Sequence, residues 1–161
     1  MVFQVPSDDD KPRFVCEGCG YIDYDNPRIV VGTLPLKAGK VLLCRRAIEP
    51  RKGYWTTPSG FMENDESLEQ GALRETLEET GCRVRLDRLH VVCSVPRVHQ
   101  VYMLFLAHWE AQECAHGFET EEVRFFEFDA IPWDRIAFAA VTKALEAYIS
   151  KSTGVVLETI D

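Results

Sequence analysis

Segments rich in branched and aromatic residues recur along most of the chain, and turn-forming residues separate several of them. Such segments are typical of β-strands, in which these side chains pack well. They occupy residues 29–36, 40–46, 84–86, 89–95, 100–109 and 123–128. The first two flank Lys37-Ala38-Gly39 and therefore predict a β-hairpin. Residues 150–161 show no clear pattern.

A helix is predicted to begin at Ser67 and to end before Gly81. Ser67 followed by Gln70 forms a capping box, and glycine is the residue at which helices commonly end. Leu73 and Leu77 lie opposite a group of glutamates. Their position predicts that this side of the helix is buried.

A second helix is predicted from Trp133 or Asp134 to about Ile149, because small and apolar residues recur there at helical spacing. Strands on both sides of the first helix, followed by a closing helix, predict an α/β fold with a mixed sheet covered on both faces. The chain has 161 residues, of which 46% are hydrophobic, which is enough for one core and one domain.

Three glutamates of the first helix stand at offsets 0, +3 and +4, at Glu75, Glu78 and Glu79. A helix would hold them on one face, where each pair repels by roughly 3 kcal/mol at about 6 Å and an effective dielectric of about 20. Arg74 alone is close, and one guanidinium cannot neutralise three carboxylates. Such oxygen ligands suit Mg²⁺ or Mn²⁺. A solvated acidic face is the alternative interpretation of the three residues alone.

Two neighbouring features favour an ion site over a solvated face. Gly71 lies on the acidic side in the middle of the helix, where glycine costs roughly 1 kcal/mol relative to alanine, so we expect something to approach the backbone closely there. Before the helix, Pro58 and Gly60 interrupt an apolar run. The resulting loop can direct backbone carbonyls toward the same ion.

The segment from Gly60 to Cys82 resembles the Nudix box, Gly-x5-Glu-x7-Arg-Glu-U-x-Glu-Glu-x-Gly-U, in which U is a bulky aliphatic residue. Every charged position and both glycines are present. The departures are Thr76 and Cys82 at the two aliphatic positions, both small enough to be buried. The resemblance covers roughly residues 14–149 and implies a Nudix α/β/α sandwich.

The resemblance also implies a reaction and a role for each box residue. Nudix enzymes split a nucleoside diphosphate linked to another group, by attack of water at phosphorus with divalent ions bound to the box. Glu75 and Glu79 would be the firmest metal-binding and catalytic residues. The other implied roles are metal binding by Glu78 and by the Ser59 carbonyl, an ion pair between Arg74 and Glu66 that holds the loop against the helix, and structural turns at Gly60 and Gly81.

The general base varies within this superfamily, and a later acidic loop offers candidates. Of Glu119, Glu121 and Glu122, we favour Glu119 or Glu122 because acidic residues precede the corresponding strand in similar sequences. A solvated acidic loop is the alternative.

Substrate identity depends on the segments that flank the box. They resemble the subgroup that contains plant FAD pyrophosphatase and its bacterial relatives, which implies cleavage of FAD or ADP-ribose with release of AMP. An NADH or other dinucleotide pyrophosphatase is an alternative, although the Ser-Gln-Pro-Trp-Pro-Phe-Pro signature of the NADH group is not found. A non-catalytic nucleotide-binding Nudix regulator is a second alternative. Such domains usually have a damaged box, whereas this box keeps all of its glutamates.

Candidate substrate-binding residues are a basic side chain and aromatic rings. Arg45 and Arg46 are adjacent in a strand, so they point to opposite faces and one at most can meet the phosphates; we select Arg45. Trp55 and Tyr102 could stack on a base. The alternative for the arginine is a solvated loop, and the alternative for the aromatic residues is ordinary core packing.

Cys16 and Cys19 form half of a zinc site, because a structural zinc takes four ligands and no cysteine or histidine precedes Cys16. The pair is interpreted as a turn that no longer binds metal, or as a zinc site completed from elsewhere, such as another subunit. A redox pair is the third alternative.

Net charge and the remaining cysteines bear on partners and location. A formal charge of −8 argues against a nucleic-acid groove and leaves a small anionic substrate, because bound cations can supply positive charge. The sequence has no apolar run of membrane length and no leader at Met1. Its six scattered cysteines suggest reduced thiols. We therefore expect a cytoplasmic protein. A homodimer is expected from similar enzymes. The expected organisation is an N-terminal tail with a partial zinc-ribbon-like segment at 1–27, a Nudix domain at 28–150 and a C-terminal tail at 151–161.

Overall fold

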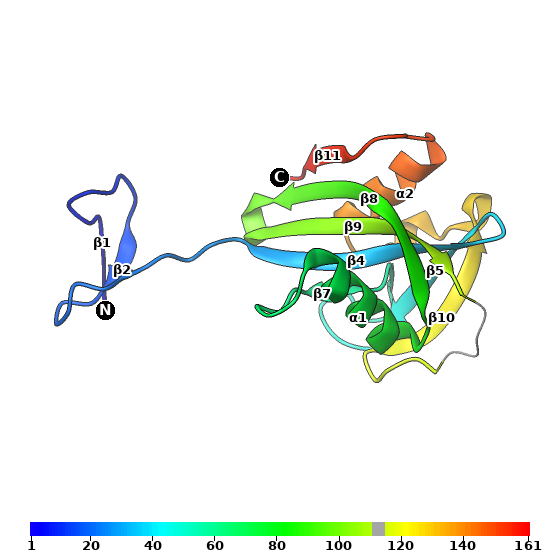
Figure 1. Ribbon diagram of the computed structural model, residues 1–161, viewed down its shortest axis with the longest axis horizontal. Coiled ribbons are helices and arrows are strands. Elements are labelled where there is room, and N and C mark those ends of the chain that lie inside the picture. The colour runs from blue at the N-terminus through cyan, green and yellow to red at the C-terminus, as the bar shows by residue number, and fades with distance from the viewer. Residues whose placement is uncertain (111–114) are drawn as a thin grey trace.

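The computed structural model describes residues 1–110 and 115–161 (Figure 1). Its helices are α1 (Leu68–Thr80) and α2 (Ala139–Ile149), with short 3₁₀ turns η1 (Pro96–Val98), η2 (Phe128–Ala130) and η3 (Trp133–Arg135). Its strands are β1 (Val2–Gln4), β2 (Arg13–Val15), β3 (Ile22–Asp23), β4 (Arg28–Lys37), β5 (Lys40–Arg46), β6 (Trp55–Thr56), β7 (Ser59–Phe61), β8 (Val84–Val95), β9 (Gln100–Trp109), β10 (Thr120–Glu127) and β11 (Val156–Thr159). None of the helices in the two described ranges is long and apolar enough to span a membrane.

The main sheet is mixed, as predicted. Its strand order is β10-β5-β4-β9-β8-β11, with β6 paired to β5 and β7 paired to β4. The pairs β4–β9 and β8–β11 are parallel, and the other pairs are antiparallel.

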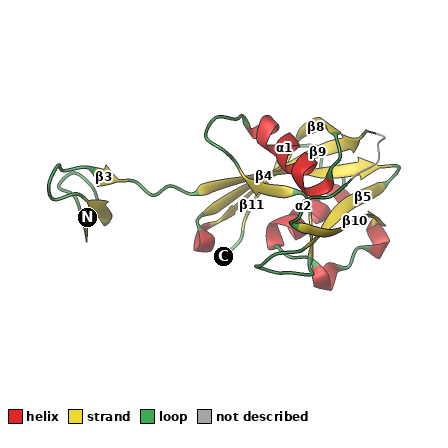
Figure 2. Cartoon of the chain, turned by 90° about the horizontal axis from the view of Figure 1, so that it is seen from below, coloured by secondary structure: helices red, strands yellow, loops and turns green. Residues whose placement is uncertain are grey.

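The two helices cover opposite faces of this sheet, with the strands between them in Figure 2. Val31 of β4 and Phe105 of β9 pack with Ala72 of α1. Alternate strand positions face the other way, where Leu34 packs with Val141 of α2. The period-2 pattern of buried residues thus supplies one core cluster under α1 and two under α2, and the predicted α/β/α arrangement is confirmed.

Several predicted boundaries moved because tertiary pairing overrides local periodicity. The predicted hairpin at 29–46 is present, whereas the two strands predicted at 84–86 and 89–95 form one strand, β8, with two irregularities in its pairing to β9. Helix α2 begins at Ala139, later than predicted, because the Ala137 N–H donates to the Trp55 carbonyl (2.8 Å) and keeps this part of the chain extended. The unassigned C-terminal residues include β11, which extends the main sheet.

Helix α1 has the predicted ends but not the predicted buried side. The capping box at Ser67 and the left-handed Gly81 are both present. Leu73 and Leu77, however, are exposed (38% and 42%), so the prediction that they are buried was wrong.

Small residues of α1 contact the sheet instead of the leucines. The Thr76 and Thr33 hydroxyl oxygens are 2.6 Å apart, and a Cβ on Gly71 would lie 2.8 Å from Val31 Cγ2. Gly71 therefore permits a close approach, as predicted, and the helix lies too near β4 for a leucine to fit in the interface. Both small residues that depart from the box pattern, Thr76 and Cys82, are buried as expected.

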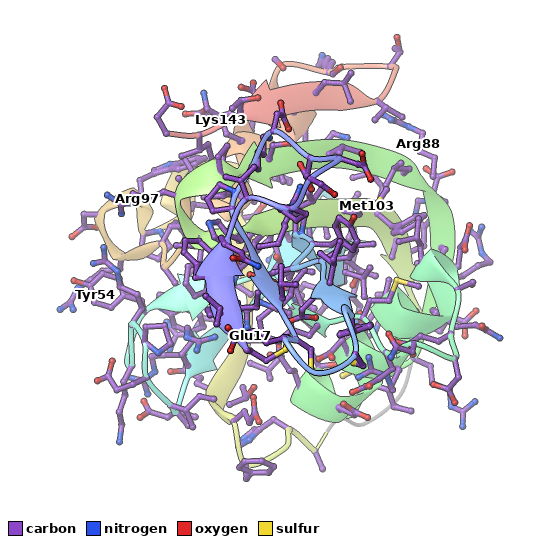
Figure 3. All side chains as sticks on the ribbon, turned by 90° about the vertical axis from the view of Figure 1, so that its left-hand side faces the viewer. Glu17, Tyr54, Arg88, Arg97, Met103 and Lys143 are labelled. Carbon is purple, nitrogen blue, oxygen red and sulfur yellow. The ribbon has the colours of Figure 1, made fainter. Side chains whose placement is uncertain are left out.

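Residues 1–27 form a separate three-stranded sheet, β1-β2-β3, joined to β4 by an extended linker (Figure 1). Figure 3 views the molecule from this side, with Glu17 of the turn between β2 and β3 labelled in front of the main domain. No residue of the segment is buried. Its internal contacts include the Phe3–Phe14 ring pair (5.1 Å) and the Arg13–Asp9 ion pair (3.0 Å).

The cysteines depart in part from the expectation of reduced thiols. Four of them, Cys16, Cys19, Cys44 and Cys93, are free. Cys82 is disulfide-bonded, so the expectation was wrong for this residue. The sixth cysteine lies outside the described residues, and the cytoplasmic location stays a prediction.

Candidate functional site

The three box glutamates line one cleft of about 760 Å³. Ser59 and Gly60 lie on the same wall. The helix face on which the sequence predicts these glutamates thus forms an acidic wall of the cleft. The rest of the cleft is lined by residues of β4 and β9, the residues after β5, the loop before β10 and the residue before α2. The sequence gives no sign that these segments lie together.

The cleft forms because β4 and β5 separate soon after their turn. They pair only at Leu36–Val41 and Lys37–Lys40, and β7 takes the place beside the start of β4. Gly32 makes this path feasible, because a Cβ there would lie 2.3 Å from the Pro58 carbonyl oxygen. The loop before α1 thus crosses directly over β4 and brings Ser59 to the helix.

Glu79 is the most buried carboxylate of the site, with 9% of its surface exposed. Its Oε2 accepts a hydrogen bond from the Ser59 backbone N–H (3.2 Å). Burial nevertheless raises the pKa of Glu79 to about 8, because a charged carboxylate loses its hydration there. Burial also raises the pKa of Glu75, although hydrogen bonding from Arg74 opposes the shift. Both acids are therefore held where a cation would stabilise their charged forms.

Arg74 connects the loop, the helix and two of the three glutamates. Its Nε and Nη2 donate to the two carboxylate oxygens of Glu66 (2.9 and 2.6 Å), and Nη2 also donates to the Phe61 carbonyl (3.1 Å). These contacts bear out the predicted Arg74–Glu66 pair. Hydrogen bonds from Arg74 lower the pKa of Glu66 to about 2. Nη1 of Arg74 donates to Glu75 (2.6 Å) and to Glu78 (3.2 Å), two contacts that the sequence did not predict.

The carboxylates suit a divalent ion in chemistry, but they do not converge on a point. Within residues 1–110 and 115–161 no three side chains of the ligand types His, Cys, Asp or Glu are gathered tightly enough to hold an ion. Mg²⁺ usually binds through one or two carboxylates, several waters and substrate phosphates, and Glu75 and Glu79 fit that pattern. The ligand roles of Ser59, Glu75, Glu78 and Glu79 remain predictions.

The two candidate bases lie in different surroundings. Glu119 lines the cleft, and its backbone carbonyl accepts a hydrogen bond from the Ala47 N–H (2.8 Å). Gly117 places this loop against α1, since a Cβ there would lie 2.5 Å from the Glu78 carbonyl oxygen. Glu122 lies on β10 and forms ion pairs with Arg45 (3.2 Å) and Arg124. Only Glu119 of these two candidates is a lining residue of the cleft.

Of the three candidate substrate residues, only Tyr102 lies in the cleft. Trp55 is buried in the core, with its ring 4.8 Å from that of Phe126. Arg45 pairs with acidic residues of β10, and its neighbour Arg46 lines the cleft instead. Alternation showed that only one of the two arginines could face the cleft but not which one.

Phe138 also lines the cleft, and the sequence analysis missed it. It immediately precedes α2, and helical periodicity had placed it inside a predicted helix. No sequence signal marks it as a site residue.

Comparison with known families and proteins agrees with this geometry. A NUDIX domain model matches residues 26–145, and a Nudix N-terminal model matches residues 1–25. An ADP-ribose pyrophosphatase from Methanocaldococcus jannaschii is 32% identical over 71% of this chain and 69% of its own length. An NAD-capped RNA hydrolase, NudC, from Chromobacterium violaceum is 32% identical over 73% of this chain, which spans less than half (44%) of that relative.

A solved structure shares both the fold and much of the sequence. The crystal structure of a NUDIX hydrolase from Nitrosomonas europaea is 44% identical, with a TM-score of 0.93 over 99% of this chain and 93% of the other. The likeness includes the N-terminal segment.

The raised pKa of Glu79 makes the stability of the metal-free protein depend on pH. A folded-state pKa of about 8, above the ordinary value of 4.5, means that the folded state retains a proton that the unfolded state has lost. Stability should therefore fall as pH rises from about 4.5 to about 8, by up to roughly 1.4 kcal/mol for each unit of pKa difference. We expect Glu79→Gln to flatten this fall, as measured by urea unfolding in EDTA at pH 5, 6.5 and 8.

Glu69→Gln is the matched control, because Glu69 is exposed and lies in the first turn of α1, away from the cleft. An unchanged slope in Glu79→Gln would show that Glu79 does not carry the effect.

Proposed function

Because this chain belongs to the Nudix family, we propose that it hydrolyses the pyrophosphate bond of a nucleoside diphosphate linked to another group, with ADP-ribose as the first candidate and AMP as a product. The observation that carries the proposal is a single cleft lined both by Glu75 and Glu79, whose pKa values burial raises, and by the aromatic rings of Tyr102 and Phe138. The acids suit a pyrophosphate with its bound cations, and the rings suit a base.

Each residue has a separate part in this proposal. Divalent ions such as Mg²⁺ or Mn²⁺, when bound, supply positive charge to the phosphate oxygens and lower the pKa of a bound water. Glu75, Glu78 and Glu79, with the Ser59 carbonyl, provide the oxygen ligands. Arg74 holds the loop carrying Phe61 against α1.

Glu119 is the proposed general base. It lines the cleft near Glu75 and Glu79, so it can accept a proton from a water that attacks phosphorus there.

Three substrate classes remain to be ranked. ADP-ribose is favoured by the M. jannaschii relative, which is named an ADP-ribose pyrophosphatase. FAD is supported as a substrate only by the sequence resemblance to the FAD pyrophosphatase subgroup. NADH or an NAD-linked substrate gains support from the NudC relatives, although the net charge of −8 argues against a long RNA. A purely regulatory nucleotide-binding role is disfavoured because every box glutamate is retained.

Turnover of a substrate panel tests the proposal directly. ADP-ribose, FAD, NADH, a dinucleoside polyphosphate and an oxidised nucleoside triphosphate would each be incubated with Mg²⁺ or Mn²⁺, and the products separated by chromatography. We expect AMP and ribose 5-phosphate from ADP-ribose, and no turnover in EDTA. Cleavage of the nucleoside triphosphate alone would refute the assignment.

The proposed base is tested by comparing two glutamates of the same loop and strand. Glu119→Gln should lower kcat by about 10²–10⁴-fold, because a positioned general base typically contributes that much. Glu122→Gln is the control, since Glu122 is paired with arginines outside the cleft. Steady-state kinetics and Mn²⁺ titration of both variants check this. A slow Glu122→Gln beside a fully active Glu119→Gln would reverse the roles.

We also propose that the chain forms a homodimer through residues 1–27. This segment has no buried residue, and it exposes apolar side chains that include Phe3, Phe14 and Tyr21. The partner's segment could also supply the two ligands that Cys16 and Cys19 lack for a four-coordinate zinc. Hydrogen bonds from the Cys19 and Gly18 backbone N–H groups and the Cys19 side chain lower the pKa of Cys16 and favour its thiolate form.

Sedimentation and metal analysis of the purified chain test this assembly. We expect a dimer that holds about one zinc ion per two chains. Phe14→Asp should weaken the dimer, whereas Leu157→Asp, which changes an exposed residue of the main domain, should not. A monomeric, zinc-free protein would refute both parts.

A further inference from the structure

One group of three cleft-lining side chains comes from separate parts of the chain. Arg46 ends β5, Tyr102 lies in β9, and Phe138 precedes α2. All three line the cleft. The Tyr102 and Phe138 rings are 6.5 Å apart and tilted by 42°, so they form an open corner.

Arg46 lines the cleft but has no carboxylate partner among the described residues. Arg45, Arg74 and Arg124 all form ion pairs. In the part of the chain that the structure describes, Arg46 forms none.

Arg46 is nevertheless held firmly in place. Its Nε donates to the Pro50 carbonyl (2.8 Å), and its guanidinium lies 5.1 Å from the centre of the Phe138 ring. These contacts leave the outer guanidinium nitrogens as donors without an acidic partner.

The charge of Arg46 acts both on the aromatic corner and on the acidic wall. Burial raises the pKa of Tyr102, and the positive charge of Arg46 opposes that rise, so the guanidinium lies within electrostatic reach of the aromatic corner. The charge of Arg46 likewise opposes the rise that burial causes in the pKa of Glu79. A planar guanidinium that can bind phosphate oxygens and stack on a ring is suited to the junction between a base and a pyrophosphate.

We propose that Phe138 and Arg46 form the subsite for the nucleoside monophosphate half of the substrate. The base packs into the corner between Phe138 and Tyr102, and Arg46 binds the phosphate next to the ribose. The proposal rests on the proposed function for the identity of the substrate. It assigns to this chain a preference for ligands that combine an aromatic base with a phosphate.

Binding of AMP and adenosine, measured by calorimetry with Mg²⁺ present, separates the two parts of the subsite. Phe138→Leu should weaken both ligands by about three- to tenfold, because stacking is lost for each. Arg46→Gln should weaken AMP by about tenfold or more but adenosine by less than about twofold, since only AMP carries the phosphate. Phe138→Tyr keeps the ring and should restore affinity.

Two variants are matched controls. Phe128→Leu changes a partly buried phenylalanine that packs against the same core cluster but does not line this cleft. Arg124→Gln removes one positive charge outside the cleft. Both should bind AMP as the unchanged protein does. Unaltered AMP affinity in Phe138→Leu and Arg46→Gln, or an equal loss of adenosine and AMP in Arg46→Gln, would overturn the proposal.

Failure of this proposal can be told apart from failure of the proposed function. Hydrolysis of ADP-ribose with an unchanged KM in both variants would refute the subsite and leave the reaction intact. The expected binding pattern for AMP without hydrolysis of any member of the substrate panel would support the subsite and refute the reaction.

Discussion

The structure of the site depends on how closely α1 approaches β4. Gly71, Ala72 and Thr76 occupy the interface, and Thr76 meets Thr33 at hydrogen-bonding distance. Because α1 presents only small side chains to β4, Glu79, one turn beyond Thr76, is buried with them. Burial costs the charged carboxylate its hydration, which is why its pKa rises. The same close packing leaves Leu73 and Leu77 in contact with solvent. The electrostatic character of the cleft is thus a result of packing.

Arg74 partly balances this concentration of negative charge. Its fork geometry lets one guanidinium reach Glu66, Glu75, Glu78 and the Phe61 carbonyl, so a single side chain fixes the loop before α1 and also neutralises part of the acidic wall. The balance is incomplete, because Glu79 is bound only by a backbone N–H. A divalent ion that arrives with a phosphate ligand would stabilise the charged form of this carboxyl group, so the wall is suited to such an ion.

The rest of the cleft is a consequence of strand geometry. Separation of β4 and β5 opens the sheet, and Gly32 lets the connecting loop cross β4. Gly117 packs on the end of α1 and brings Glu119 to the opening. The segment at 1–27 has no part in either core, which agrees with a role in contacts beyond a single chain. The loop before α1 and the candidate base are therefore placed by separate backbone features.

The sequence by itself determined the box helix with its capping box and glycine stop, the β-hairpin before it, the mixed sheet and the Arg74–Glu66 pair, because each depends on local spacing or on a 23-residue pattern. The tertiary structure decided which face of α1 is buried, that Arg46 and not Arg45 enters the cleft, that Trp55 belongs to the core, and that Glu119 and not Glu122 faces the carboxylates. These choices depend on strand twist, loop paths and the distance between helix and sheet. Phe138 joins the site only through such long-range contacts, which local periodicity does not encode.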